Sequence, residues 1–290
     1  MAIDYKNTGG KMTKQALKNS IKLAAFDIDG TILPYTQSHF SDTITKMFKE
    51  LKNKNIYSTL ATAREFVTIG NLAQNTPDLD YFIGANGMFV YDFKLKKMIY
   101  EKPIALSELK IIHSAIQNID QAIGMTITDL NWCYYTEGTD INTWFLSPHY
   151  SKMKPMDFNM MDKDHLHIIT IMCKNKQDTE ITVTKIKEVI KQNNLDLDVN
   201  STWHKGLFIC PKNVTKSDTI DWLANYLGLK NSENVIAFGD SSNDFEMVKN
   251  AAWGVAMEEC DPELKKVAKD IAKSVKEDGV YLKLKELNLI

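Results

Sequence analysis

The sequence predicts an α/β protein whose parallel-sheet core is interrupted by an inserted α+β unit. Over residues 21–85, apolar strand patterns alternate with amphipathic helix patterns in the order β-α-β-α-β, which is typical of a parallel sheet with helices on both faces. Hairpin and antiparallel patterns replace this order over residues 86–200, and the first pattern returns over residues 201–290. The length of 290 residues leaves room for a second unit, because one domain averages about 150 residues.

The first core segment begins with Leu23–Phe26, a short apolar run typical of a buried parallel strand. Ser41 is placed to cap a helix, because its hydroxyl can accept from a free backbone amide at a helix start. The apolar residues of that helix repeat at helical spacing: Ile44, Met47, Phe48 and Leu51. Three further elements are expected: a strand over Ile56–Ala61, a helix from about Arg64 that buries Phe66, Val67, Ile69 and Leu72, and a strand over Tyr81–Ala85.

The insert, residues 86–200, is predicted to have a small sheet of its own. Met88–Asp92 and Met98–Glu101 have the pattern of an antiparallel hairpin. Further strands are expected over Gly124–Thr128, Trp132–Thr136, His165–Cys173 and Leu195–Asn200, and helices over about 107–118 and 178–192.

The core pattern is predicted to resume with Leu207–Cys210, as a strand of the parallel sheet. A helix follows from about Lys216 to Gly228, where glycine favours the left-handed backbone of a helix end. The last expected elements are strands over Val235–Phe238 and Val255–Met257, a helix over Phe245–Asn250 and a helix that begins at Asp261-Pro262.

The composition excludes several classes of protein. The 35 Lys+Arg and 37 Asp+Glu give a net charge of −2, whereas a nucleic-acid-binding domain is usually basic; a local cluster of cations would still suffice to bind an anionic small molecule.

Residues 1–20 are polar and are predicted to be a flexible or loosely docked leader without a secretory signal. No stretch reaches the roughly 20 apolar residues of a membrane-spanning helix. The four cysteines form neither a CxxC pair nor a zinc spacing, so we expect reduced thiols and a cytoplasmic location.

Asp27 and Asp29 follow the first predicted strand, and side chains two residues apart project on the same side of an extended backbone. Two carboxylates this close raise each other's pKa unless they share a cation or a proton. Gly30 permits a tight turn at the carboxyl end of the strand, where open α/β sheets hold ligands. An isolated Asp-x-Asp-Gly is more often a surface turn. A calcium loop needs Gly and Glu at its sixth and twelfth positions, where Ile32 and Ser38 stand here.

A second acidic turn follows another short apolar strand and contains Asp240, Asn243 and Asp244. Alone, it is typical of a turn and helix cap. Two acidic turns at the ends of parallel strands together favour a shared divalent-cation site, and oxygen ligands favour Mg²⁺ over zinc.

Thr62 and Lys216 would complete a phosphate site. Thr62 ends the second predicted strand, so its hydroxyl and a following helix N-terminus would both face the same edge of the sheet. Lys216 lies near a helix start, where a cation opposes the helix dipole and a structural role is disfavoured. Alone, Thr62 would be interpreted as an ordinary helix cap, and Lys216 would be interpreted as a solvated surface lysine.

Together, these residues resemble the motifs of the haloacid dehalogenase (HAD) superfamily of phosphohydrolases. The matching positions are Asp27-x-Asp29-Gly30-Thr31 for the first motif, Thr62 for the second, Lys216 for the third and Gly239-Asp240-x-x-Asn243-Asp244 for the fourth. The resemblance covers residues 21–290. The long interval between the second and third motifs is similar to the Cof-type subgroup, also called subfamily IIB, which has a Rossmann-like core and an α/β cap in that interval.

The resemblance implies Mg²⁺-dependent hydrolysis of a small phosphorylated metabolite through an aspartyl-phosphate. In that reaction Asp27 would be the nucleophile, and Asp29 would act as the acid and then as the base. The implied metal ligands are Asp27, the Asp29 carbonyl, Asp240 and Asp244. The implied phosphate ligands are Thr62, Lys216 and Asn243, and Arg64 would contact the substrate. Candidate contacts of the cap are Trp144, His149, Lys152, Lys154 and, near its end, His204. We expect a monomer or a weak homo-oligomer.

Two departures and two alternatives accompany this interpretation. Ala63 stands where the second motif usually has Gly, and Glu258-Glu259-Cys260 stands where the subgroup usually has Gly-Asn-Ala. No motif carboxylate, hydroxyl or lysine is missing, so these departures bear on the substrate. A phosphotransferase such as a phosphomutase would use the same aspartyl-phosphate, and a regulatory protein could use the fold without turnover.

Overall fold

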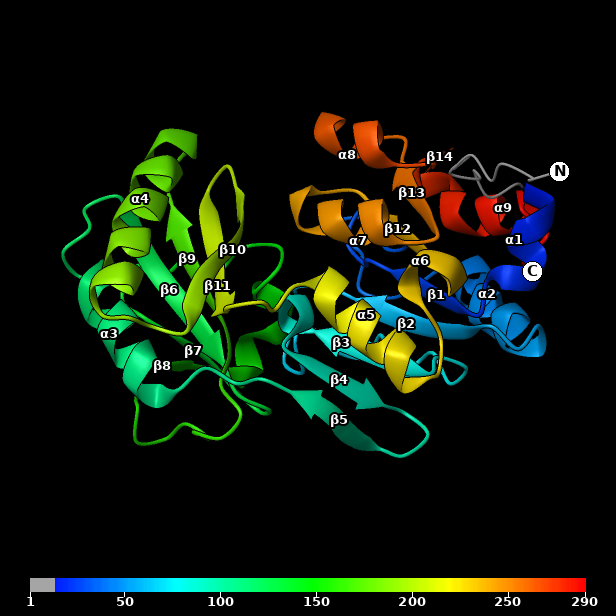
Figure 1. Cartoon of the computed structure of the whole chain (residues 1–290). Coiled ribbons are helices and arrows are strands. Elements are labelled where there is room, and N and C mark those ends of the chain that lie inside the picture. The colour runs from blue at the N-terminus through cyan, green and yellow to red at the C-terminus, as the bar shows by residue number, and fades with distance from the viewer. Residues whose placement is uncertain (1–13) are drawn as a thin grey trace, which may run out of the picture.

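The computed structural model describes residues 14–290 and contains two β-sheets that lie side by side (Figure 1). The first sheet has the strand order β14-β13-β12-β1-β2-β3-β4-β5, and the second has the order β10-β11-β9-β6-β7-β8. This arrangement confirms the α/β class with a parallel core. The part of the predicted leader that covers residues 1–13 lies outside the described residues.

The centre of the first sheet is parallel, and β1 lies between β12 and β2, so the register sets Phe26 beside Phe238 on one side and Leu60 on the other. The parallel strands are β1 (Leu23–Phe26), β2 (Tyr57–Ala61), β3 (Tyr81–Gly84), β12 (Val235–Gly239), β13 (Trp253–Met257) and β14 (Asp270–Ala272). Two antiparallel strands, β4 (Phe89–Asp92) and β5 (Lys97–Glu101), extend one edge.

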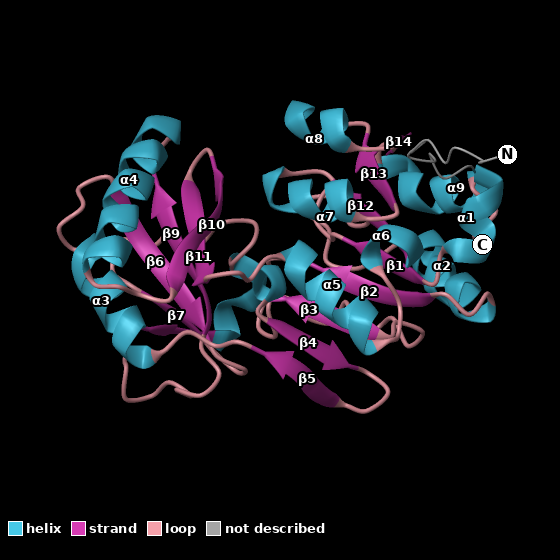
Figure 2. Ribbon diagram, viewed as in Figure 1, coloured by secondary structure: helices cyan, strands magenta, loops and turns pink. Residues whose placement is uncertain are grey.

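Helices cover both faces of this sheet (Figure 2). One face packs against α5 (Lys216–Tyr226), α7 (Phe245–Asn250) and α8 (Pro262–Val267), and the other against α1 (Lys14–Ser20), α2 (Asp42–Asn53) and α9 (Gly279–Glu286). The short α6 (Asn231–Asn234) precedes β12. Ser41 caps α2 as predicted, because its hydroxyl accepts from the amide of Ile44 at 3.1 Å. Short 3₁₀ helices cover Ala85–Gly87, Ser147–Lys152, Ser242–Asp244 and Val275–Glu277.

The second sheet is built from the insert and carries α3 (Leu106–Ile116) and α4 (Lys176–Gln192) on its outer face (Figure 1). Its strands are β6 (Ala122–Thr128), β7 (Cys133–Tyr135), β8 (Met153–Pro155), β9 (His167–Cys173), β10 (Leu197–Trp203) and β11 (Gly206–Pro211). The predicted helices and strands of residues 107–200 are therefore confirmed within a few residues.

Three predicted strands, one from the core segment and two from the hairpin, belong to a different sheet from the one that the sequence predicted. Leu207–Cys210 belongs to β11, which pairs antiparallel with β10 and β9, because only two residues separate β10 from β11 and so short a connection makes neighbours antiparallel. The predicted hairpin β4–β5 extends the first sheet, because the turn Ala85–Gly87 after β3 is too short to lead elsewhere. The limits 86–200 of the insert as a folding unit stay a prediction.

The prediction of a helix after Arg64 was wrong. Residues 65–80 form successive turns instead, because the Glu65 carboxylate accepts from the backbone amides of Val67 and Thr68, and such side-chain bonds compete with helical ones. Val67, Ile69 and Leu72 are nevertheless buried as expected. The leader prediction was also wrong for residues 14–20, which form α1 and bury Leu17.

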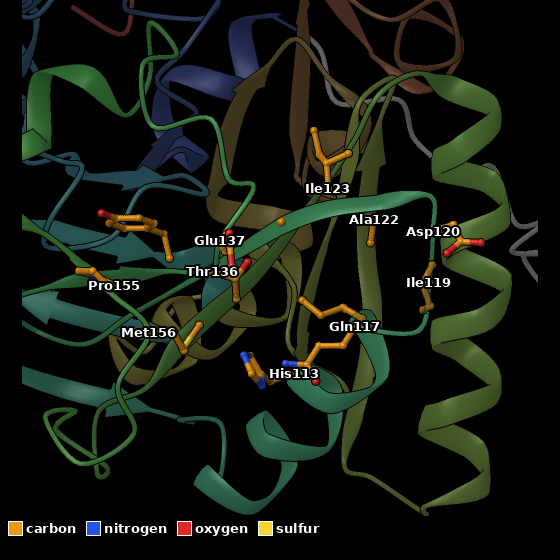
Figure 3. Close-up of a pocket in the computed structure, with 13 residues that line it drawn as sticks. His113, Gln117, Ile119, Asp120, Ala122, Ile123, Thr136, Glu137, Pro155 and Met156 are labelled. Carbon is orange, nitrogen blue, oxygen red and sulfur yellow. The ribbon is translucent and has the colours of Figure 1, made fainter.

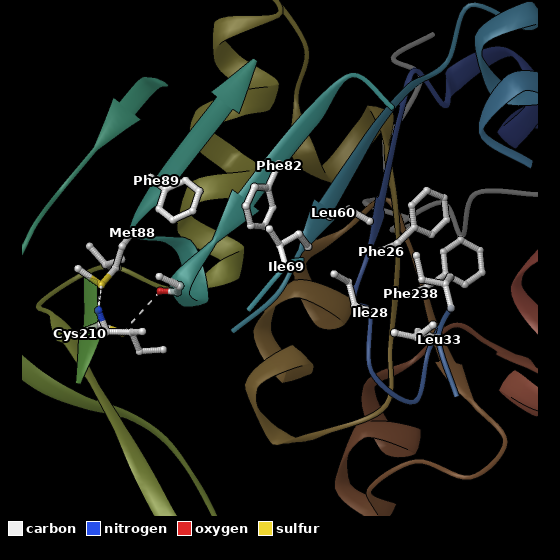
Figure 4. Packing of buried hydrophobic residues seen from close by; sticks show 14 of the residues in the cluster. Phe26, Ile28, Leu33, Leu60, Ile69, Phe82, Met88, Phe89, Cys210 and Phe238 are labelled. Carbon is white, nitrogen blue, oxygen red and sulfur yellow. Dashed lines mark hydrogen bonds between the residues drawn. The ribbon is translucent and has the colours of Figure 1, made fainter. Parts of the chain in front are cut away.

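The packed core joins both sheets (Figure 4). Phe26 stacks on Phe238 with ring centroids 5.5 Å apart, and the same cluster continues through Phe82 and Phe89 to Met88 at the insert. There the amide of Ile168 donates to the Met88 sulfur at 3.0 Å. Among the described helices, none is long and apolar enough to cross a bilayer.

A charged cluster also links the sheets, because Glu101 ends β5, His167 begins β9 and His165 lies two residues before β9. His165 Nδ1 lies 2.8 Å and His167 Nε2 2.7 Å from Glu101 Oε1. Burial alone would raise the pKa of Glu101, but the hydrogen bonds from His167 and His165 outweigh it and lower that pKa. The hydrogen bond to Glu101 raises the pKa of His165 above its usual range.

This cluster predicts a pH-dependent contribution to stability. A histidine pKa that is raised by folding stabilises the protein below the unfolded value of 6.5, and that contribution is lost as the pH rises through the folded value. We expect His165→Gln to lower the free energy of unfolding more at about pH 5.5 than at about pH 8.5, on either side of the ordinary histidine pKa, as measured by urea unfolding.

His113→Gln is the matched control, because burial lowers the pKa of His113 and the pH dependence should have the opposite sign. An equal loss at both pH values in His165→Gln would contradict the role of the Glu101 pair.

Candidate active site

Three of the predicted site residues follow the ends of adjacent parallel strands. Asp27 follows β1, Thr62 follows β2 and Asp240 follows β12, and the amide of Asp27 donates to the carbonyl of Phe238 at 3.0 Å. Carboxyl ends of parallel strands meet at one edge of a sheet, where ligands bind in open α/β folds. The structure therefore brings the two predicted acidic turns together.

A buried lysine joins the two acidic turns. Lys216 Nζ donates to Asp27 Oδ1 at 2.6 Å and to Asp244 Oδ1 at 2.7 Å, and its side chain is 1% exposed. Burial alone would lower the pKa of Lys216, but the charges of Asp244 and Asp27 raise it. Burial raises the pKa of Asp27, and the charge of Lys216 opposes that effect. The Lys216 ammonium thus holds the predicted nucleophile in place.

Asp244 supports the second turn. Its Oδ2 accepts from the amides of Asp240 and Ser241 at 3.0 and 3.1 Å, while Oδ1 accepts from Lys216. Both oxygens of Asp244 therefore have partners within the protein, and its main role in this arrangement is to fix Lys216 and the backbone of Asp240.

Asp240 has a carboxylate oxygen that is available for a cation. Its Oδ2 accepts from the Tyr35 hydroxyl at 3.0 Å, while the buried Oδ1 has no hydrogen-bond partner among residues 14–290. Burial, together with the Asp244 charge, raises the pKa of Asp240 to about 7. Asp27, Asp240 and Asp244 can each place one oxygen within 4.8 Å of the others. An unpartnered buried oxygen in a set of oxygen donors fits Mg²⁺.

Asp29 is bound by Arg64 through two hydrogen bonds. Arg64 Nε donates to Asp29 Oδ2 at 2.8 Å and Nη2 donates to Oδ1 at 2.7 Å, while Nη1 donates to the carbonyl of Thr68. This is the two-pronged geometry of a strong guanidinium–carboxylate pair. Arg64, predicted as a substrate contact, here contacts the predicted acid and base.

Thr62 is buried, and its hydroxyl accepts from the amide of Arg64 at 3.2 Å. The helix N-terminus expected beside it is absent, since residues 65–80 form turns. Asn243 lies on the opposite turn, where its amide nitrogen donates to Asn86 Oδ1 at 3.0 Å. Both predicted phosphate ligands therefore lie in the walls of the site.

Two further residues belong to the site. Asn86 is fully buried with a left-handed φ of 56°, and its side-chain nitrogen has no partner within the described part of the chain. The Asn86-Gly87 pair is a turn signal that could have pointed to it. Tyr35, which contacts Asp240, carries no recognisable signal in the sequence.

The insert contributes the wall of a cavity of about 920 Å³ beside Arg64. Its lining includes Trp144, Phe145, His149 and Lys152, so three of the predicted cap contacts lie there. Lys154 instead places its ammonium 3.5 Å from the centroid of the Trp132 ring. Another cavity, of about 710 Å³, lies within the insert near His113 (Figure 3). Asp27, Asp240 and Asp244 line neither cavity, and Arg64 lines only the larger one.

Comparisons with known proteins show the family to which the chain belongs. The family model for haloacid dehalogenase-like hydrolases matches residues 24–284. The chain is 27% identical to the 5-amino-6-(5-phospho-D-ribitylamino)uracil phosphatase YcsE of Bacillus subtilis over 271 residues, which cover 93% of this chain and 96% of that protein.

Solved structures show the same fold. A HAD subclass IIB sugar phosphatase superposes with a TM-score of 0.76 at 21% identity, over 93% of this chain and 100% of that chain. A phosphatase of the haloalkanoate (HAD) superfamily from Bacteroides thetaiotaomicron superposes with a TM-score of 0.78 at 19% identity, over 93% of this chain and 96% of that chain.

The buried lysine predicts a large effect on stability. Lys216→Met leaves the buried carboxylates of Asp27 and Asp244 without their cation, and removing one partner of a buried ion pair costs about 3–5 kcal/mol. We expect a loss of that size in the free energy of unfolding, measured in urea with EDTA present.

Lys230→Met removes an exposed lysine paired with Glu233 and should change stability little. Adding Asp27→Asn to Lys216→Met should recover part of the loss, because one uncompensated charge is removed. A loss as small as that of the Lys230 control would show that Lys216 does not balance these carboxylates.

Proposed function

Because the chain belongs to the haloacid dehalogenase-like hydrolase family, we propose that it hydrolyses a small phosphorylated metabolite through an aspartyl-phosphate, an acyl phosphate formed on Asp27. The observation that carries this proposal is the Asp27–Lys216 pair beside the unpartnered oxygen of Asp240 within the described chain. A fixed carboxylate, a buried cation and a free metal ligand are what displacement at phosphorus requires.

Asp27 supplies the nucleophilic oxygen. Asp27 Oδ1 accepts a hydrogen bond from Lys216. Asp27 Oδ2 accepts from the Thr31 hydroxyl at 3.4 Å, which is long for such a bond. Oδ2 therefore keeps electron pairs to attack phosphorus. As the Asp27–phosphorus bond forms, the bond from phosphorus to the leaving alkoxide breaks, and one hard displacement becomes two easier ones.

Mg²⁺ would be held by Asp27, the carbonyl of Asp29 and Asp240, and when bound it would neutralise charge on the phosphoryl oxygens. Lys216 adds a second positive charge on the same side. Thr62 supplies a hydroxyl for a non-bridging oxygen, and Asn243 and Asn86 supply amide groups in the wall of the site.

Asp29 moves the protons. In the first step it gives a proton to the leaving alkoxide, and in the second it takes one from the water that attacks the phospho-enzyme. The two hydrogen bonds from Arg64 hold the Asp29 carboxyl group in an aligned position. Donation in the first step requires Asp29 to carry a proton and to leave the guanidinium.

The cavity beside Arg64 is our proposed site for the leaving group. It combines the aromatic rings of Trp144 and Phe145 with the Lys152 ammonium. Burial lowers the pKa of His149 to about 4, so this side chain is a neutral hydrogen-bonding group near pH 7. Such a lining suits a polyhydroxylated or heterocyclic group, in line with the phosphorylated ribityl compound named for the Bacillus subtilis relative and with the sugar phosphatase of similar fold.

A panel of phosphorylated metabolites, together with an aryl phosphate, tests this function. We expect release of inorganic phosphate in Mg²⁺, loss of that activity in excess EDTA and recovery on adding Mg²⁺, because the cluster around Asp240 needs a cation. Isomerised sugar phosphate without phosphate release would indicate a mutase instead. Turnover that persists in excess chelator would remove the metal from the mechanism.

The two carboxylates of the first turn should behave differently on substitution. Asp27→Asn lacks the nucleophile and should form no phospho-enzyme. Asp29→Asn keeps the nucleophile, and an aryl leaving group departs without a proton, so the variant should release a burst of about one equivalent of aryl alcohol per site. Breakdown should slow by about 10²–10⁴-fold, the usual contribution of a general base.

Rapid-quench kinetics and intact-protein mass spectrometry measure the burst and the phospho-enzyme. A burst from Asp27→Asn with none from Asp29→Asn would mean that the roles of the two residues are reversed.

A further inference from the structure

Two adjacent aromatic residues of the insert contact two residues of the proposed active site. The Trp144 ring meets Tyr35 edge-to-face, with centroids 5.5 Å apart and planes at 87°. The Phe145 ring centroid lies 5.1 Å from the guanidinium carbon of Arg64. Tyr35 and Arg64 are in turn the residues that hydrogen-bond to Asp240 and Asp29.

Tyr35 fixes the orientation of the Asp240 carboxylate. Because its hydroxyl donates to Oδ2 at 3.0 Å, the other oxygen is presented in a set direction, and that oxygen is the buried one without a partner in residues 14–290. A Cβ at Gly30 would lie 2.3 Å from Asp240 Oδ2 and 2.8 Å from the Tyr35 hydroxyl. Glycine at position 30 therefore leaves the space in which these two groups meet.

Phe145 acts on the other carboxylate. Arg64 is buried and makes two hydrogen bonds to Asp29, while Phe145 lies against its guanidinium. A cation beside an aromatic ring is attracted to the negative face of that ring. Phe145 thereby helps to hold the arginine that aligns Asp29.

The Trp144–Tyr35 contact is not part of a packed core. Trp144 is 45% exposed and Tyr35 is 51% exposed, so these large rings meet at the surface. Because residues 144 and 145 are neighbours in the chain, any displacement of this segment changes both contacts together.

On the basis of the function proposed above, we propose that Trp144 and Phe145 are positioning residues that couple the insert to the two active-site carboxylates. Trp144 acts through Tyr35 on Asp240, and Phe145 acts through Arg64 on Asp29. Metal binding and the position of the insert are then linked, since coupling between two sites is reciprocal.

Calorimetric titration of the full chain with Mg²⁺, without substrate, tests whether Trp144 acts through Tyr35 on Asp240. Tyr35→Phe should weaken Mg²⁺ binding about tenfold, because a hydrogen bond to a charged group is lost. Trp144→Leu should weaken it about threefold, in the range of an aromatic pair, whereas Trp144→Phe should restore most of the affinity. In a Tyr35→Ala background, Trp144→Leu should have no further effect.

The rate of phospho-enzyme breakdown, measured by rapid quench, tests whether Phe145 acts through Arg64 on Asp29. Phe145→Leu should slow breakdown about threefold and leave the Mg²⁺ affinity unchanged, whereas Trp144→Leu should change the Mg²⁺ affinity by a larger factor than it changes breakdown at saturating Mg²⁺. Each variant is the control for the other. Tyr150→Phe, which alters an exposed tyrosine of the same segment, should change neither quantity.

The outcomes separate this inference from the proposed function. A wild-type protein that binds Mg²⁺ and releases phosphate, with Trp144→Leu and Phe145→Leu unchanged in both measurements, overturns the coupling alone. Equal changes of both quantities in both variants would show general structural damage and also overturn it. A wild-type protein that binds no Mg²⁺ overturns the metal of the proposed function, and with it the Trp144 path.

Discussion

The buried ammonium of Lys216 is the constraint on which the candidate site depends. Three carboxylates lie at the ends of β1 and β12 with little access to water, and charges so placed repel one another unless a cation is shared. Lys216 bridges Asp27 and Asp244, and Asp244 in turn fixes the backbone of Asp240. The start of α5 must therefore stay against the strand ends, which ties the helix layer to the chemistry.

The sequence predicts the parts of this arrangement that follow from the sheet alone. Parallel neighbours end at one edge, so the strand pattern is sufficient to place Asp27, Thr62 and Asp240 there. It is not sufficient for the pairing of Arg64 with Asp29, because that pairing depends on turns that replace a helix over residues 65–80. A short apolar run such as Leu207–Cys210 has the same pattern in parallel and antiparallel sheets, and here a two-residue connection decides between them.

The core and the insert meet through contacts of different kinds. Apolar packing around Met88 and the Glu101–histidine cluster join the two sheets near the point where the chain leaves β5. Aromatic residues 144 and 145 join them again beside the carboxylates. Met88 and His167 of the first set are buried, whereas Trp144 and Tyr35 are exposed, so water can replace the Trp144–Tyr35 contact more readily.

The central position of β1 has a consequence for biosynthesis. β1 is made early, yet one of its two neighbours is β12, more than 200 residues later. One edge of β1 thus has no native partner on the ribosome until almost the whole chain has emerged, while every strand of the second sheet is already complete. Pairings so distant in sequence form slowly, and unpaired strand edges promote aggregation. The strand whose edge stays unpaired longest during synthesis is therefore the one that ends beside Asp27, the proposed nucleophile.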